Sequence, residues 1–299
     1  METASASVLS FEEKRTLLEG DVLSCAYSPN GQVLACSMRG GMLSLQMVVS
    51  GSYYAPVKMV NVKASSVVSF LDPQMVVHSM DRESGASAGV LDLEKGKYTR
   101  LFTGHSADVY NISSNTVLKS VITCAENDYV LVWDMRQKAP YARIPSKKRP
   151  VAKYSPDGKI FSLFFDEKKE MKLFDARSFS TGPYATKILE AFGYRDADFS
   201  PDGRKMVLLH DRSFTLVDGL DGATLGTIAS EHAASAAFST DNAYLLYTSS
   251  PNQIAACSVQ SLKCINTWTL SSDVPVRQIY INPTYAQAGV LAGALSLWQ

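Results

Sequence analysis

The side chains that most often carry out chemistry are few in this chain of 299 residues, and they are widely spaced. There are five cysteines, at positions 25, 36, 124, 257 and 264, and four histidines, at 78, 105, 210 and 232. The cysteines form no CxxC pair, and neither the HExxH zinc motif nor the GxxxxGK[ST] phosphate loop occurs. Each histidine lies on or beside an expected strand, and the scattered carboxylates are typical of turns. We therefore expect no catalytic residue, no cofactor and no metal site.

Most of the cysteines lie inside apolar runs, such as Leu23–Ala26 and Ala255–Cys257. In such runs cysteine behaves as a small buried hydrophobe, and free thiols indicate a reducing compartment. The N-terminus has neither a basic start nor a long apolar stretch, and no run approaches the roughly 18 apolar residues of a membrane helix. These patterns predict an intracellular protein without a membrane segment.

Charge and composition restrict the class of protein further. The 29 basic and 29 acidic residues balance, so the overall field does not favour binding to a phosphate backbone. Hydrophobic residues make up 46% of the chain, which is enough for a core and excludes global disorder. The length is about twice the ~150 residues of an ordinary domain, so it fits two domains or one large closed β structure. We expect no direct, sequence-specific binding of nucleic acid, although a local basic patch is compatible with these numbers.

A short phrase recurs along the chain at a nearly constant interval. The strong copies are Tyr27–Gly31 (YSPNG), Tyr154–Gly158 (YSPDG) and Phe199–Gly203 (FSPDG). Weaker copies are Leu71–Gln74, Ile112–Asn115, Phe238–Asn242 and Ile281–Thr284. With the proline or its equivalent at 29, 73, 114, 156, 201, 240 and 283, the steps are 44, 41, 42, 45, 39 and 43 residues. Seven copies at the roughly 40–45-residue spacing of WD40 blades fill the chain.

The phrase has the residues of a tight turn, because proline fixes φ and Asp/Asn-Gly supplies positive φ. In the fourth unit the flanking strands are expected at Pro150–Tyr154, Ile160–Phe165, Glu170–Phe174 and Tyr184–Leu189. In the fifth unit they are expected at Ala197–Phe199, Lys205–His210, Ser213–Val217 and Ala223–Ile228. No segment shows a 3.6-residue apolar period of helix length. Four strands in each of seven units predict an all-β, seven-bladed β-propeller that occupies residues 1–299 as a single domain.

The third unit carries the sharpest signature. Gly104-His105 precedes Trp133-Asp134, which matches the GH and WD pair of WD40 repeats. In such repeats the histidine, a Ser or Thr of the second strand, an Asp of the next turn and the tryptophan form a buried hydrogen-bonded set. The matching residues here are His105, Thr123, either Asn127 or Asp128, and Trp133. We expect a structural role for them, because buried polar groups need partners.

The last unit is one strand short. Its strands are expected at Val276–Ile281, Gly289–Leu291 and Leu295–Trp298. The segment Lys14–Leu18 precedes the first unit and is compatible with a strand. We expect it to become the outer strand of the last blade, so that the first and last blades lock together and no edge stays open.

A string in the fourth unit resembles one WD40 family in particular. It runs from Leu173 to Tyr184, and Arg149–Ala152 and Ser155–Phe161 precede it. The chain is similar to the Swd-type subunit shared by Set1/COMPASS histone methyltransferase complexes and by transcription-termination assemblies. In the latter, that subunit sits beside type-1 protein phosphatase and its nuclear targeting subunit (PNUTS), or in the cleavage and polyadenylation machinery. The second and sixth units depart from the family pattern, so the chain resembles a divergent member.

The resemblance implies a nuclear, non-catalytic scaffold that is present as one copy in a hetero-complex. The implied partners are a PNUTS-like phosphatase-targeting subunit, type-1 phosphatase, a Set1-type methyltransferase and the phosphorylated C-terminal repeat of RNA polymerase II. A general WD40 adaptor of another, cytoplasmic pathway is the alternative. An enzyme is a third class, because propellers also host catalysis.

In a propeller, the loops between blades share one face with the loops that join the second and third strands of each blade. Here that face is expected to present the basic residues Arg39, Arg82, Lys147, Lys148, Arg149, Lys168, Lys169, Arg195 and Arg212. It is also expected to present the acidic residues Asp81, Glu83, Glu126, Asp128, Asp166, Glu167 and Asp211. Because arginine binds phosphate or carboxylate through paired hydrogen bonds, a phosphopeptide or acidic peptide is a candidate ligand. The alternative is a solvated rim of mixed charge.

Two further loops carry aromatic residues that are candidates for a protein interface. Tyr53 and Tyr54 lie in Gly51–Pro56, and Phe179 and Tyr184 lie in Ser178–Tyr184. Aromatic residues often anchor interfaces. The alternative is that these side chains cap the outer strands.

Overall fold

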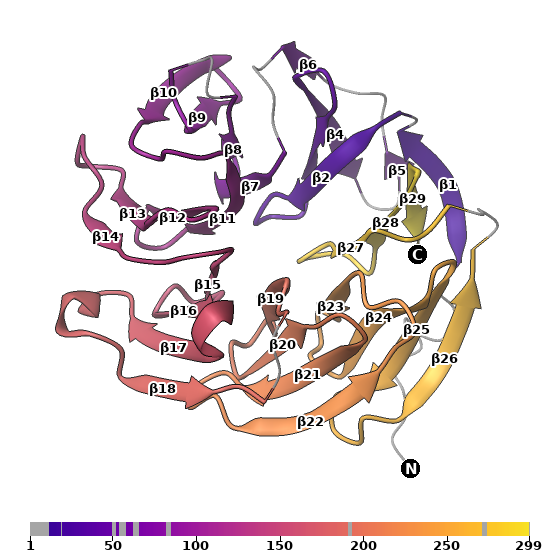
Figure 1. The fold of residues 1–299 in the computed structure, drawn as a ribbon. Helices are drawn as coiled ribbons and strands as arrows, with labels where there is room; N and C mark the ends of the chain where they lie inside the picture. Colours follow the sequence, from indigo (N-terminus) through magenta and orange to yellow (C-terminus); the bar gives the residue numbers. More distant parts are fainter. Residues whose placement is uncertain are drawn as a thin grey trace.

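Seven antiparallel β-sheets surround a central axis in the computed structural model, like the blades of a propeller (Figure 1). The structure describes residues 12–18, 20–49, 52–53, 58–61, 66–81, 85–190, 193–270 and 274–298. Among these residues, six sheets have four strands, and the sheet of the first unit has five. No helix within the described ranges is long and apolar enough to cross a membrane. The predicted all-β, seven-bladed propeller is confirmed.

The blades are numbered in chain order, and each begins with its innermost strand. Blade 1 consists of β2 (Val22–Tyr27), β3 (Val33–Met38), β4 (Met42–Val49), β5 (Ser52–Tyr53) and β6 (Lys58–Asn61). Blade 2 consists of β7 (Val68–Asp72), β8 (Met75–Ser79), β9 (Ala88–Asp92) and β10 (Lys97–Phe102). Blade 3 consists of β11 (Val109–Asn115), β12 (Ser120–Ala125), β13 (Val130–Asp134) and β14 (Ala142–Ile144).

The remaining blades follow the same order. Blade 4 consists of β15 (Val151–Tyr154), β16 (Ile160–Phe165), β17 (Glu170–Asp175) and β18 (Ala185–Ile188), with two short 3-10 turns, η2 (Asp166–Lys168) and η3 (Phe179–Thr181). Blade 5 consists of β19 (Asp196–Phe199), β20 (Lys205–Leu209), β21 (Ser213–Asp218) and β22 (Thr224–Ala229). Blade 6 consists of β23 (Ala236–Phe238), β24 (Tyr244–Ser250), β25 (Gln253–Ser258) and β26 (Cys264–Thr269). Blade 7 consists of β27 (Gln278–Ile281), β28 (Ala288–Ala292), β29 (Ala294–Trp298) and β1 (Glu13–Leu18).

The recurring phrase forms the turn between the first and second strands of a blade. In blade 4 the Ser155 hydroxyl donates to Asp157 Oδ1 at 2.7 Å and accepts the Ile160 backbone N–H at 3.0 Å. Gly158 has a φ of +69°, a conformation that L side chains rarely adopt. The same serine-to-carboxylate bond occurs at Ser200 with Asp202 at 2.6 Å. The phrase therefore fixes the turn by local hydrogen bonds, and it predicts the strands of blades 4 and 5 to within one residue at each boundary.

The turn of blade 3 lies two residues later than the sequence predicted. The strand continues to Asn115, and the turn occupies residues 116–119, so Thr116 rather than Ser114 takes the place of the proline. Asn115 replaces the serine of the phrase: its Oδ1 accepts the backbone N–H of Val117 at 3.0 Å. Its Nδ2 donates to the carbonyl of Gly158 in blade 4 at 2.8 Å. An asparagine at this position therefore joins neighbouring blades, as Asn282 of blade 7 also does through Gly31 of blade 1 at 2.9 Å.

The apolar core is divided among the spaces between blades. Seven clusters of buried residues lie between successive pairs of blades, including the pair formed by blade 7 and blade 1. Between blades 3 and 4, for example, Phe161 stacks on Phe174 with ring centroids 4.8 Å apart. Each blade thus buries both of its faces against neighbours, and its hydrogen bonding runs outward from the axis.

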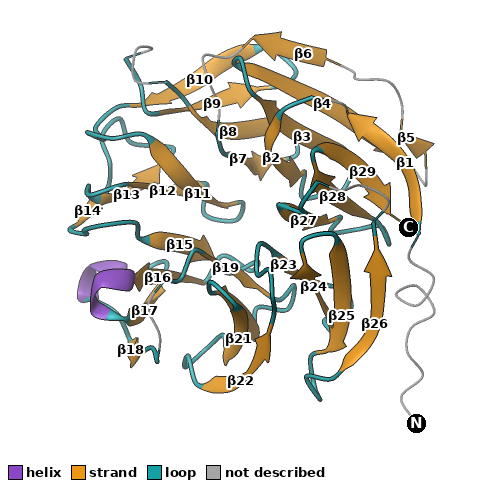
Figure 2. Cartoon of the chain, turned by 45° about the vertical axis from the view of Figure 1, so that its right-hand side comes forward, coloured by secondary structure: helices purple, strands orange, loops and turns teal. Residues whose placement is uncertain are grey.

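The ring is closed by the N-terminal strand. β1 pairs antiparallel with β29, with Glu13 opposite Trp298 and Leu18 opposite Leu295 (Figure 2). Leu17 and Leu18 pack against the cluster that blades 7 and 1 share. β1 is therefore the outer strand of blade 7, as predicted from the missing strand of the last unit.

Deletion of residues 1–18 should destabilise the whole ring, because it removes β1 and exposes the edge of β29. We expect the melting temperature to fall by about 10 °C. Each kcal/mol lost from the free energy of unfolding lowers the melting temperature of a chain of this size by roughly 2–4 °C. Deletion of residues 1–10, which leaves β1 in place, is the matched control. Equal melting temperatures for the two truncated chains, measured by calorimetry, would contradict a closing role for β1.

Candidate partner-binding face

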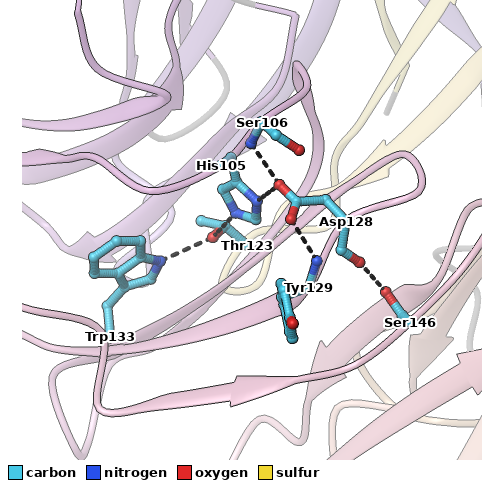
Figure 3. A network of polar contacts seen from close by, with 7 residues as sticks. All are labelled: His105, Ser106, Thr123, Asp128, Tyr129, Trp133 and Ser146. Atoms are coloured by element: carbon cyan, nitrogen blue, oxygen red, sulfur yellow. Dashed lines mark hydrogen bonds and ion pairs between the residues drawn. The ribbon is translucent and has the colours of Figure 1, made fainter.

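A buried polar chain in blade 3 joins the residues that the GH and WD pair singles out (Figure 3). The Trp133 indole N–H donates to Thr123 Oγ1 at 2.8 Å. His105 Nε2 lies 2.7 Å from the same Thr123 oxygen, and His105 Nδ1 lies 3.0 Å from Asp128 Oδ2. The His105 imidazole is fully buried, and Asp128 also accepts the backbone N–H of Ser106 at 2.6 Å. This buried polar chain fastens the loop before β11 and the turn after β12 to the two middle strands of the blade.

The structure decides between Asn127 and Asp128. Asp128 is the member of the buried chain, whereas Asn127 is exposed and has a positive φ of 52°. The Asn127 backbone N–H donates to the carbonyl of Lys148 at 2.8 Å, and its side-chain oxygen accepts the Lys148 N–H at 2.9 Å. Asn127 therefore holds the loop between blades 3 and 4, which carries Lys147, Lys148 and Arg149.

The protonation of the buried chain follows from its donors. An indole N–H only donates, so Thr123 Oγ1 accepts from Trp133 and donates its hydroxyl hydrogen to His105 Nε2. Nδ1 then carries the imidazole proton toward Asp128. Burial lowers the pKa of His105 below its usual value, although Asp128 opposes this effect. Burial would raise the pKa of the Asp128 carboxyl, but hydrogen bonds from Ser106, Tyr129 and His105 together hold it below its usual value.

The predicted basic residues lie in the expected loops of one face, wherever the structure describes them. Arg39 follows β3, Lys168 and Lys169 follow β16, and Arg212 follows β20. Lys147, Lys148 and Arg149 precede β15, and Arg195 precedes β19. Arg82 lies outside the described residues. Arg39 is paired with Asp21, with Nε and Oδ2 2.5 Å apart, beside a separate cavity of about 290 Å³.

The structure brings two of the predicted arginines to a common cavity. Arg149 and Arg195 both line a cavity of about 560 Å³ over blades 3, 4 and 5, together with Tyr110 and Tyr194. The Arg149 guanidinium lies over the Tyr110 ring, 4.2 Å from its centroid. Such stacking orients the planar group and leaves its N–H donors at its edge. The side chains of Arg149 and Arg195 are 61% and 62% exposed, so a ligand from solvent can reach them.

Carboxylates share this cavity with the arginines. Arg149 Nη1 lies 4.0 Å from Glu126 Oε2, and Arg195 Nη2 lies 2.5 Å from Asp211 Oδ1. The surface is therefore a rim of mixed charge, which is the arrangement that the alternative drawn from the sequence describes. Ion pairs this exposed contribute little to stability, so they can exchange for another anion at small cost.

The central channel holds a charged cluster that the sequence reasoning missed. Lys153 Nζ lies 3.9 Å from both Asp196 Oδ1 and Asp198 Oδ1, in a cavity of about 500 Å³ that Arg149 and Arg195 also line. Burial works to lower the pKa of Lys153, but the two carboxylates hold it above its usual value. Partial desolvation in the channel raises the pKa of Asp198, although its side chain is 53% exposed; Lys153 opposes this effect and Asp196 adds to it. The signal that could have found them is their place just before the aromatic residue of the phrase in adjacent blades. Lys153 and Asp198 directly precede Tyr154 and Phe199, and Asp196 lies two residues before Asp198.

The aromatic candidates divide into different environments. Tyr184 is 51% exposed, whereas Phe179 is partly buried and lies with its ring centroid 5.7 Å from that of Phe161. Phe179 also makes an edge contact with Tyr141 at 5.2 Å, so its position fits the capping alternative. Tyr53 lies in the short strand β5 rather than in a loop, and Tyr54 lies outside the described residues.

One string has the spacing of a catalytic motif without its geometry. Gly85–Gly89 (GASAG) fits GxSxG, the nucleophile elbow of hydrolases, which needs a sharp turn from a strand into a helix. Here Ser87 leads directly into the antiparallel strand β9, and its side chain is buried. Its backbone N–H donates to the carbonyl of Phe102 at 2.8 Å, within the sheet. The string is therefore part of a blade.

Comparison with known proteins agrees with this architecture. The family description "WD domain, G-beta repeat" matches residues 11–53 and 96–134. The Cps50 (Swd1) β-propeller domain of Myceliophteria thermophila superposes with a TM-score of 0.80 at 14% identity, covering 96% of this chain and 99% of that one. The chain therefore carries WD40 repeats in the matched residues and folds as a seven-bladed β-propeller.

The similarities in sequence point to one group of these propellers. WD repeat-containing protein 82 of Drosophila melanogaster is 24% identical over 217 residues, which are 70% of this chain and 68% of that protein. COMPASS component SWD2 of Saccharomyces cerevisiae is 24% identical over 249 residues, 79% of this chain and 75% of that protein. Set1 complex component swd2 of Schizosaccharomyces pombe is 21% identical over 250 residues, 78% and 70% of the two chains. The predicted resemblance to Swd-type subunits is confirmed, and the low identities fit a divergent member.

Replacement of Thr123 by valine should destabilise blade 3, because it leaves the Trp133 N–H and His105 Nε2 buried without partners. We expect a loss of about 2–4 kcal/mol in the free energy of unfolding, from urea denaturation. Thr227→Val is the matched control, since Thr227 is exposed on β22 and its change should stay within about 0.5 kcal/mol. An unchanged stability for Thr123→Val would show that the buried chain does not hold the blade.

Stability should fall as the pH is lowered from 7.5 to 5.5. Burial lowers the pKa values of both His78 and His105, so below about pH 6.5 the unfolded chain binds protons that the folded chain resists. His78 is fully buried, with Nδ1 2.8 Å from the carbonyl of Ser79 and Nε2 2.8 Å from the Tyr98 hydroxyl. In His78→Asn the decrease of the unfolding free energy between these pH values should be smaller than in the original chain. Equal decreases would contradict a contribution from His78.

Proposed function

We propose that this protein is a non-catalytic scaffold subunit of a nuclear Set1-type histone methyltransferase complex. The observation that carries the proposal is the similarity to the Saccharomyces and Schizosaccharomyces proteins, which spans 79% and 78% of this chain. Those two proteins are named as components of COMPASS and of the Set1 complex. A similarity that extends over most of the ring favours conservation of the ring's role rather than of a single repeat.

The closed propeller supports a scaffold. Its sheets are held in one ring by clusters between every pair of adjacent blades, so loops from distant parts of the sequence keep fixed positions on each face. A rigid platform of this kind binds partners with little loss of conformational entropy. A PNUTS-like phosphatase-targeting subunit with type-1 phosphatase is the partner set of the second assembly in this family, and the same platform would serve it.

The face with Arg149 and Arg195 supports a finer proposal, the recognition of a phosphorylated partner such as the C-terminal repeat of RNA polymerase II. Two exposed guanidinium groups line one cavity with two tyrosines, and arginine forms paired hydrogen bonds with phosphate. The zero net charge of the chain would confine this recognition to one face. A cytoplasmic WD40 adaptor is the second candidate function, because general WD40 repeats account for the family match alone.

Affinity purification of the tagged full-length chain, from nuclear and cytoplasmic extracts in parallel, tests the proposal. We expect a Set1-type methyltransferase to co-purify from the nuclear extract, identified by mass spectrometry. The Arg149→Glu/Arg195→Glu variant should keep the methyltransferase and lose phosphorylated polymerase. Arg136→Glu/Arg204→Glu, which makes the same charge change in exposed loops of the opposite face, is its control. A PNUTS-like subunit without the methyltransferase would replace the proposal by the termination assembly. Partners from the cytoplasmic extract alone would favour the adaptor.

A further inference from the structure

We infer that Glu126 and Asp211 are internal competitors for the anion that Arg149 and Arg195 bind, so that the site rejects single-charged carboxylates and admits a doubly charged phosphoryl group. The inference rests on the proposed recognition of a phosphorylated partner and adds how that site selects its ligand. It concerns four side chains that line one cavity of about 560 Å³.

The first pair lies on one side of blade 4. Arg149 comes from the loop between blades 3 and 4, and Glu126 follows β12, the second strand of blade 3. Arg149 Nη1 and Glu126 Oε2 are 4.0 Å apart, and the guanidinium also stacks on Tyr110. The aromatic contact fixes the plane of the guanidinium, so its edge donors remain aimed at an acceptor when Glu126 leaves.

The second pair repeats this arrangement on the other side of blade 4. Arg195 comes from the loop between blades 4 and 5, and Asp211 follows β20, the second strand of blade 5. Arg195 Nη2 and Asp211 Oδ1 are 2.5 Å apart, and both side chains are more than half exposed. In each pair an inter-blade loop supplies the arginine and a neighbouring turn supplies the acid. The two pairs, one from each side of blade 4, therefore line a shared cavity.

The charges decide which ligand can displace the acids. A phosphoryl group carries about −1.5 to −2 at neutral pH and three acceptor oxygens, whereas an Asp or Glu of a partner carries −1 and two. A partner carboxylate only replaces one internal carboxylate by another and gains nothing. A phosphoryl group brings a larger charge and one more acceptor oxygen than the carboxylate that it displaces. Because the pairs are exposed, they hold the arginines weakly and yield to the stronger acceptor.

The chain contains a matched control for this arrangement. Arg39 and Asp21 form a third ion pair on the same face, with Nε and Oδ2 2.5 Å apart. Arg39 lines the separate cavity of about 290 Å³ over blades 1 to 3 and does not line the cavity of Arg149 and Arg195. Loss of the Asp21 charge changes the net charge of the face equally, so it reports the general electrostatic effect alone.

Binding of a serine-phosphorylated RNA polymerase II repeat peptide, and of the same peptide with Glu in place of phosphoserine, tests the inference. The full chain is titrated by calorimetry at low salt, as the original sequence and as Asp211→Asn, Glu126→Gln and Asp21→Asn. We expect each of the first two substitutions to tighten phosphopeptide binding by about fivefold and to make Glu-peptide binding detectable. Asp21→Asn should leave both unchanged. A gain in affinity cannot result from misfolding.

A double-mutant cycle isolates the contact itself. The gain from Asp211→Asn should disappear in an Arg195→Gln background, because the acid then has no arginine to release. If the original chain binds the phosphopeptide but Asp211→Asn and Asp21→Asn change its affinity equally, the internal competition is overturned. The proposed recognition of a phosphorylated partner would then still stand. Absence of phosphopeptide binding in the original chain and in both cavity variants would overturn the recognition of phosphorylated partners as well.

Discussion

A blade of this ring can bury its two apolar faces only against two neighbouring blades, and this constraint organises the whole molecule. A row of six or seven sheets would leave an apolar face exposed at each end, so the row must close. Closure depends on strand β1, which completes blade 7 and packs Leu17 and Leu18 into the cluster shared with blade 1. The Tyr280 hydroxyl of blade 7 accepts the Cys25 N–H of blade 1 at 2.9 Å across the same junction. The two ends of the sequence thus form one structural unit.

Because a buried apolar cluster joins every pair of adjacent blades, individual blades can lose the polar signature of their repeat. Among the described residues, the His-Thr-Trp-Asp chain is complete in blade 3, where it ties the loops to the middle strands. Other blades rely on the serine-centred turn, as at Ser200 in blade 5 and Ser239 in blade 6. Blades 3 and 7 use asparagine in that position and gain a bond to the next blade. The turn is therefore the better preserved element, and the buried histidine is a local reinforcement.

The difference between the well-preserved turn and the variable side-chain contacts also explains which features could be predicted from the sequence. Strands flanking a Ser-Pro-Asp-Gly turn were located to within one residue, because proline and glycine fix both ends of the turn. In blade 3 the turn has neither residue, its positive φ falls on Lys119, and the prediction missed by two residues. Spacing alone could not show which of the adjacent residues Asn127 and Asp128 belongs to the buried chain. In the structure Asp128 points into the blade and Asn127 points outward. The loops that carry Arg149 and Arg195 followed from topology, but their pairing with acids and the Lys153 cluster depend on side-chain positions in space.

Balanced charge takes a specific form on the face of the ring. A neutral chain can place its basic residues in a patch of one sign, or it can pair them one by one with acids. Arg39, Arg149 and Arg195 are paired one by one with acids, each with a carboxylate supplied by a neighbouring loop. A patch of one sign attracts every polyanion at long range, including nucleic acid, whereas paired arginines present almost no net field beyond about 10 Å in physiological salt. Under the proposed recognition, a ligand would have to outcompete the internal acids at contact distance, so the selectivity of the face would come from the ligand's chemistry rather than from overall charge.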